Sequence, residues 1–84
     1  MTKQIYINEI ENLTKKLYNY YENLYISNGK GDFNGFFEAK RPVDKIWGKH
    51  LEGRLYIHSR ATKSQLEGLY IDLVNYISDQ HINL

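Results

Sequence analysis

The sequence predicts a single small α+β domain with the element order α-β-β-α: a long N-terminal helix, a two-stranded antiparallel hairpin and a C-terminal helix. Three observations support this prediction. Apolar residues recur at helical spacing near both ends of the chain, and polar and apolar residues alternate in a segment between them. The length of 84 residues suits one domain, residues 1–84, with a modest core.

Residues 3–26 form the first predicted helix. Its apolar side chains, Leu13 and Leu17 among them, fall on one arc when successive residues are turned by about 100°, and the charged ones avoid the centre of that arc. The helix should end at residues 27–29, because Asn28 and Gly29 tolerate the left-handed conformation that closes helices.

The middle of the chain predicts the hairpin. Residues 54–59 alternate polar with apolar and are rich in β-forming residues, so they predict a strand. Residues 33–40 form the other expected strand, which Gly35 would loosen and Pro42 would end. Residues 42–49 connect the two, and we expect one short helical turn there with Pro42 at its first position.

Residues 63–80 form the last predicted helix. Leucines line one face, and Thr62 with Gln65 has the spacing of a capping box at its start. Gly68 lowers helix propensity by about 1 kcal/mol relative to alanine, which weakens this turn unless another backbone packs closely there.

Composition excludes several classes of protein. With no Cys, the chain has no disulfide, thiolate metal site or cysteine nucleophile. The N-terminal residues do not resemble a signal peptide and no apolar run could span a membrane, so we expect a cytoplasmic protein without a membrane partner. Abundant Asn, Lys, Ile and Tyr with little Ala and Arg indicate A/T-rich codons, as in a low-GC bacterium, its phage or a plasmid.

Positive charge is concentrated in residues 30–63. This segment holds eight Lys and Arg against four Asp and Glu, although the whole chain has a net charge of only +1. Aromatic residues lie among these cations, a mixture that would let a nucleic acid meet cations with its phosphates and stack its bases on rings. The alternative is that the rings form the core and the cations a solvated face. The candidate binding residues of this segment are Lys40, Arg41, Lys45, Trp47, Lys49, Arg54 and Arg60.

One short motif resembles an enzyme site. Asp32 followed by Glu38-Ala39-Lys40 resembles the acidic residue and E-x-K pattern of restriction-endonuclease-like nucleases, in which carboxylates on adjacent strands hold Mg²⁺. The match covers about nine residues, and the two acids lack the full hairpin that separates them in that family. We therefore interpret it as a chance match and expect no catalytic residue, metal site or cofactor.

The first helix suggests a protein partner. Tyr18 and Tyr25 lie beside its core face, so its apolar surface is broader than one core requires. We predict a small protein-binding module that occludes an acidic surface of a larger protein, as an inhibitor, immunity factor or regulatory subunit would. A nucleic-acid-binding protein using residues 30–63 is the alternative, and a homodimer would be a further way to cover the first helix.

Overall fold

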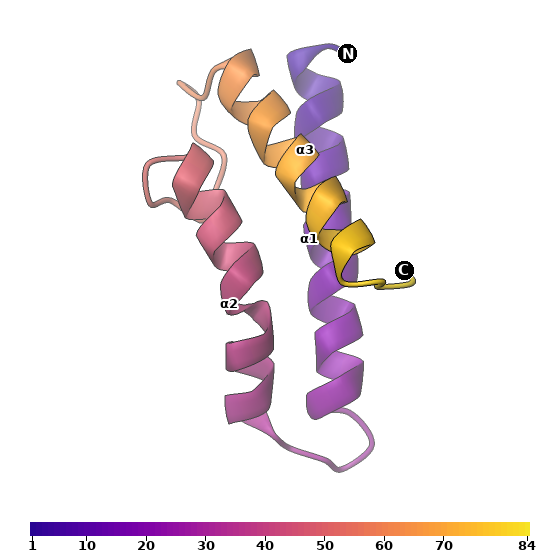
Figure 1. The fold of residues 1–84 in the computed structure, drawn as a ribbon. Helices are drawn as coiled ribbons and strands as arrows, with labels where there is room; N and C mark the ends of the chain where they lie inside the picture. Colours follow the sequence, from indigo (N-terminus) through magenta and orange to yellow (C-terminus); the bar gives the residue numbers. More distant parts are fainter.

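The computed structural model describes all residues, 1–84, as three α helices without any strand (Figure 1). The helices are α1 (Lys3–Tyr25), α2 (Phe33–His50) and α3 (Lys63–Asp79). They run alternately down, up and down, and each helix contacts the other two. The predicted α-β-β-α fold is therefore wrong, and the domain is all-helical.

Residues 33–50, predicted as a strand and a helical turn, form one helix of 18 residues. Asp32 caps its start, where its Oδ1 accepts a hydrogen bond from the Gly35 amide at 2.9 Å. Gly35 is needed at this point because a Cβ there would lie 2.7 Å from Cδ1 of Tyr25. Pro42 lies inside the helix on its exposed side, where it removes one backbone hydrogen bond without disturbing the packed face.

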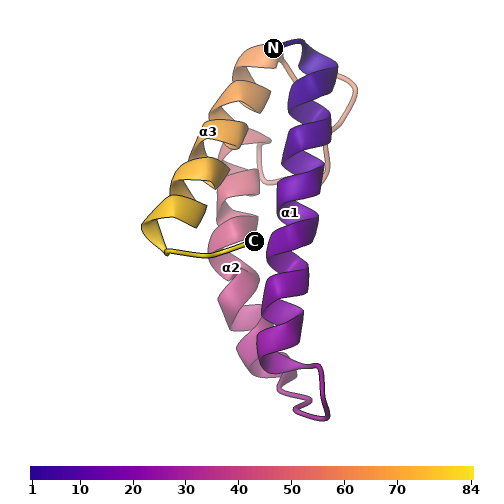
Figure 2. The ribbon, with the colours of Figure 1, turned by 90° about the vertical axis from the view of Figure 1, so that its right-hand side faces the viewer.

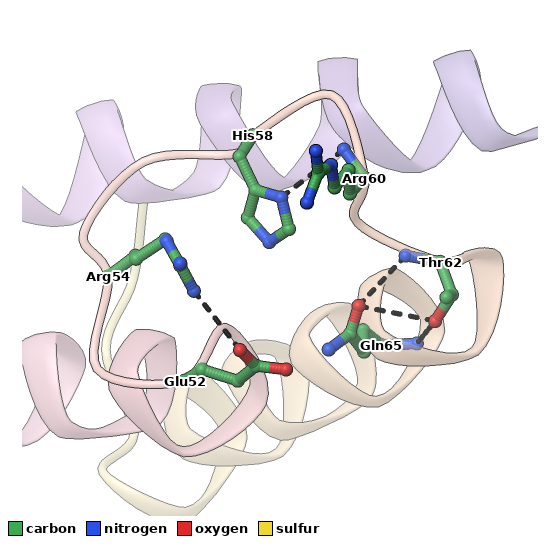
Figure 3. Close-up of polar contacts among 6 residues, drawn as sticks. All are labelled: Glu52, Arg54, His58, Arg60, Thr62 and Gln65. Carbon is green, nitrogen blue, oxygen red and sulfur yellow. Dashed lines mark hydrogen bonds and ion pairs between the residues drawn. The ribbon is translucent and has the colours of Figure 1, made fainter.

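Residues 54–59, the other predicted strand, belong to the irregular connection between α2 and α3. A strand here would have no partner, since residues 33–40 are helical. The connection is held instead by local contacts (Figure 3): His58 Nδ1 accepts a hydrogen bond from the Arg60 amide at 3.2 Å. Leu51 and Ala61, at its two ends, are fully buried and anchor it to the core.

The two terminal helices were predicted correctly to within one residue. Asn28 and Gly29 adopt positive φ after α1, as expected of a chain that leaves a helix. The capping box before α3 is present: Thr62 Oγ1 accepts from the Gln65 amide at 3.1 Å, and Gln65 Oε1 accepts from the Thr62 amide at 2.8 Å (Figure 3).

The core lies where all three helices meet. Gly68 allows close approach, although it faces a side chain and not another backbone: a Cβ at this position would lie 2.8 Å from Cε1 of His50. One polar pair is buried among the apolar residues, since Trp47 Nε1 donates to Thr14 Oγ1 at 3.0 Å. The largest fully buried side chains are Ile10, Leu17, Val43, Leu51, Leu66, Leu69 and Leu73.

The α1–α2 hairpin extends beyond α3 (Figures 1 and 2). Helix α3 packs along one half of the hairpin and ends well short of the turn that joins α1 to α2. Close to its end, the hydroxyl of Tyr76 shares a hydrogen bond with that of Tyr21, which lies in the last two turns of α1. Past this point only the end of α1, the start of α2 and the connecting turn remain. One end of an elongated molecule of 40 × 23 × 19 Å is therefore two helices thick where the other is three.

Candidate binding surface

A cluster of aromatic and charged side chains lies along the seam between α1 and α2. On α2 its members are Phe33, Phe37, Lys40 and Asp44, which share one face because they are four, three and four residues apart. Tyr18 faces them from α1, donating a hydrogen bond from its hydroxyl to Asp44 Oδ1. We call these five residues the hairpin patch.

Lys40 is at the centre of the hairpin patch. Its Nζ lies 5.2 Å from the ring centroid of Tyr18, 5.7 Å from that of Phe36 and 5.4 Å from that of Phe37. Aromatic faces attract a cation at such distances. The three rings therefore hold the ammonium group at a fixed place on the seam.

The two oxygens of the Asp44 carboxylate contact different neighbours. One oxygen accepts from Tyr18, and the other lies 3.9 Å from Lys40 Nζ. Burial raises the pKa of the Tyr18 hydroxyl far above its ordinary value, and the hydrogen bond to Asp44 raises it further. Tyr18 thus remains a neutral donor at physiological pH and fixes the orientation of the carboxylate.

Two phenyl rings of the hairpin patch are open to solvent. The exposed fractions are 57% for Phe33 and 53% for Phe37. Tyr25, at the end of α1, is half-buried against Gly35 nearby. These fractions show that no other element of the chain covers the two phenyl rings completely.

A shallow hollow of about 360 Å³ adjoins the patch on the α1 side. Tyr18, Trp47 and Leu55 supply its apolar lining. Trp47 contributes little surface, since only 6% of it is exposed and its indole nitrogen is bonded to Thr14. The hollow is therefore a widening of the seam and not an enclosed ligand cavity.

The other predicted cations do not gather at one site. Arg41, Lys49 and Arg54 form ion pairs with Glu38 at 2.9 Å, Asp72 at 3.3 Å and Glu52 at 3.2 Å, respectively. Lys45 and Arg60 are exposed and form no ion pair, and Arg60 lies in the α2–α3 connection.

Of the predicted binding residues, the structure thus brings Tyr18 and Lys40 into contact and places Tyr25 and Trp47 along the same seam. Sequence reasoning noted Phe33 and Phe37 only among the aromatic residues of segment 30–63, and it missed Asp44 and the grouping of all three with Lys40. The signal was their regular spacing around Lys40, which becomes visible only when residues 33–50 are read as a helix.

The nuclease-like motif has no nuclease-like geometry. Asp32 caps α2, Glu38 pairs with Arg41, and Lys40 faces the rings of the seam. The strands that would align the two acids are absent, and no group of three His, Asp or Glu side chains is placed to hold a metal ion.

A second polar cluster joins the end of α2 to α3. His50 Nε2 lies 2.6 Å from Asp72 Oδ2, and Lys49 approaches the same oxygen. The hydrogen bond from His50, and then the one from Lys49, keep the pKa of the Asp72 carboxyl below its ordinary value. No hydroxyl nucleophile is bonded to this His–Asp pair, so we interpret it as a link between the helices.

None of the three helices is long and apolar enough to cross a lipid bilayer. Comparison of the chain with protein-family models, with curated proteins and with solved structures finds no match. The function of the chain must therefore be inferred from the hairpin patch and the residues around it.

Proposed function

We propose that this chain is a small helical protein-binding module that occludes an acidic surface of a larger protein, as an inhibitor, immunity factor or regulatory subunit does. One observation carries the proposal: Phe33 and Phe37 are exposed, on one face, at the end of the hairpin that α3 leaves uncovered. Adjacent solvent-exposed phenyl rings on a helix are typical of interaction sites.

The energetic argument favours a partner at this place. Full burial of an exposed phenyl side chain contributes about 1.5–3 kcal/mol, and because Phe33 and Phe37 are 57% and 53% exposed, a partner that completes their burial gains roughly half of this from each ring. Both rings are carried by a helix that is already formed, which limits the entropy lost on binding. Aromatic anchors on a rigid element are common hot spots of protein interfaces.

Two lysines of α2 support an acidic partner, although acidic and basic side chains are equal in number around the patch. Lys40 lies within the patch, and Lys45, which has no ion pair, extends from the same helix. An exposed cation such as Lys45 accelerates the encounter with an acidic surface more than it strengthens the final complex.

The nucleic-acid alternative has weaker support. Trp47 is buried and hydrogen-bonded to Thr14, so it offers no face on which a base could stack. Three of the basic residues predicted to meet phosphates, Arg41, Lys49 and Arg54, already pair with carboxylates of the chain.

A photocrosslinking experiment tests the proposal. A photoreactive phenylalanine analogue replaces Phe37 in one variant and Ile71, an exposed residue on α3, in the matched control. Both are expressed in the organism that makes the protein, after circular dichroism has shown that they are folded. We expect a discrete protein adduct from position 37 and none from position 71, and we expect Phe33→Ser to abolish that adduct.

The same experiment can overturn the proposal. The absence of an adduct at position 37, or equal adducts from both positions, would show that the hairpin patch is not a docking site. An adduct that nuclease digestion removes would favour the nucleic-acid alternative instead.

A further inference from the structure

The Lys40 ammonium group lacks a hydrogen-bond acceptor. Its side chain is 26% exposed, and its only charged neighbour, Asp44 Oδ2, lies 3.9 Å away, beyond hydrogen-bonding distance. The other oxygen of Asp44 is taken by Tyr18. An ammonium group has three N–H donors, and none of the three bonds to an oxygen of this chain.

The surrounding rings attract the charge but do not replace an acceptor. Tyr18, Phe36 and Phe37 place the ammonium at the surface of the seam and restrict its movement. An oxyanion brought to this place would form charge-assisted hydrogen bonds with a group that is already positioned. The ammonium group of Lys40 is therefore positioned to donate hydrogen bonds to an anion from outside the chain.

The local charge favours a single carboxylate over a chain of phosphates. Residues 32–45 contain three acidic and three basic side chains, so the surface around Lys40 is neutral as a whole. Glu38 and Asp44 would both repel a polyanion that follows the helix, whereas one carboxylate at Lys40 meets only Asp44, whose charge is already shared with Lys40 and Tyr18. The exposed rings of Phe37 and Phe33 lie one turn and two turns from Lys40 on the same face of α2. They would pack best against an apolar group beside that carboxylate.

We propose that the hairpin patch binds a segment of the partner protein in which an Asp or Glu side chain lies beside a bulky apolar side chain. The carboxylate accepts hydrogen bonds from Lys40 Nζ, and the apolar side chain packs between Phe33 and Phe37. This inference rests on the proposed function and specifies the chemistry of the partner at that same surface.

Selection of short random peptides displayed on phage tests the inference with the protein alone. We expect the selected peptides to carry an acidic residue next to an aromatic or large aliphatic one. For the best synthetic peptide, changing its carboxylate to the amide should weaken binding to the unmodified protein about tenfold, the loss of one charge-assisted hydrogen bond. The same change should have almost no effect on binding to Lys40→Met.

Two controls make the result specific. Lys16→Met removes an exposed lysine of α1 that forms no ion pair and lies outside the hairpin patch, and it should retain the full preference for the carboxylate. The amide substitution alters only the peptide, so the comparison stands even if Lys40→Met is less stable than the unmodified protein.

The possible failures are distinguishable. Peptides that require Phe33 and Phe37 but show no preference for an acid would overturn the inference and leave the proposed function standing. Peptides that bind Phe33→Ser/Phe37→Ser equally well, or the absence of any saturable binder, would overturn both. Displacement of the peptide by single-stranded DNA, or a dimer in light scattering that Phe37→Ser abolishes, would place a nucleic acid or a second copy on the patch and overturn the inference.

Discussion

The two ends of the α1–α2 hairpin are built from the same helices but bury their apolar side chains to very different degrees. Where α3 packs on the hairpin, Ile10, Val43 and Leu69 are completely buried. At the opposite end, Phe33 and Phe37 are more than half exposed. The difference teaches that the fold is stabilised mainly by the three-helix end, and that the apolar side chains of the two-helix end are free for another use.

The largest expected effect is at the three-helix end. Leu69→Ala removes a fully buried side chain of α3 and should lower the free energy of unfolding by about 2–5 kcal/mol, because it leaves a cavity where the three helices meet. Urea denaturation followed by circular dichroism measures the loss. A cost below about 1 kcal/mol would mean that this end is loosely packed, and the contrast between the two ends would disappear.

Gly68→Ala should also destabilise the protein, although alanine is the better helix former. The added methyl group would lie 2.8 Å from Cε1 of His50, whose ring is tied to Asp72, so repacking should cost about 1–3 kcal/mol and exceed the gain in propensity. Asn75→Ala, at an exposed position of the same helix, is the matched control and should be neutral or slightly stabilising. If Gly68→Ala raised stability as the control does, α2 and α3 would not be in close contact at this point.

Acid should weaken the contact between α2 and α3 through Asp72. The pKa of Asp72 in the folded protein lies below the unfolded value of 3.8. The ionised carboxylate therefore stabilises the folded state above pH 3.8, and this stabilisation is lost as the pH falls through the folded pKa. The carboxylate is partly exposed, and the effect should be at most about 1 kcal/mol. Asp72→Asn should therefore cost stability at pH 7 and little at the acid end of the titration. Urea midpoints measured across this range that fell in parallel for both proteins would show that other carboxylates cause the acid sensitivity.

The smallest effect on stability is expected at the two-helix end. Phe37→Ser replaces an exposed ring and should change the free energy of unfolding by no more than about 0.5 kcal/mol, while it removes the proposed docking site. Thermal unfolding compared with that of Leu69→Ala checks this directly. A decrease in stability as large as that of Leu69→Ala would show that Phe37 supports the fold. The ring would then not be free to contact a partner.

The terminal helices could be predicted from sequence because their signals are local. Thr62 and Gln65 satisfy each other across one turn, and Asn28 with Gly29 ends α1 wherever the helix packs. Such signals depend on neighbours in the chain and hold in almost any tertiary context.

The middle of the chain could not be predicted in this way, because its local signals point away from the fold. Gly35 and Pro42 are ordinary helix breakers, yet Gly35 lies in the first turn that Asp32 caps, and Pro42 faces solvent. Residues 54–59 alternate like a strand but have no strand to pair with. Tertiary packing determines the secondary structure of these segments, and patterns in a single sequence carry little information about tertiary packing.

The candidate site could be predicted only in part, for the same reason. Tyr18 and Lys40 were identified from side-chain chemistry alone. Phe33 and Phe37 were not grouped with Lys40, because on the expected strand they would have lain on the opposite face, and Asp44 was assigned to the separate helical turn of residues 42–49. The correct helical period brings them together.

Pro42 gives α2 an internal boundary between its two halves. Proline has no amide hydrogen, so the carbonyl of Glu38 lacks its usual donor, and the two halves of α2 are joined by one hydrogen bond fewer. We therefore expect the turns that carry Phe33 and Phe37 to exchange their amide hydrogens faster than the three-helix end does. A partner bound across the seam would cover these turns, so amide exchange in the first half of α2 would slow on binding while the rest of the helix stayed unchanged.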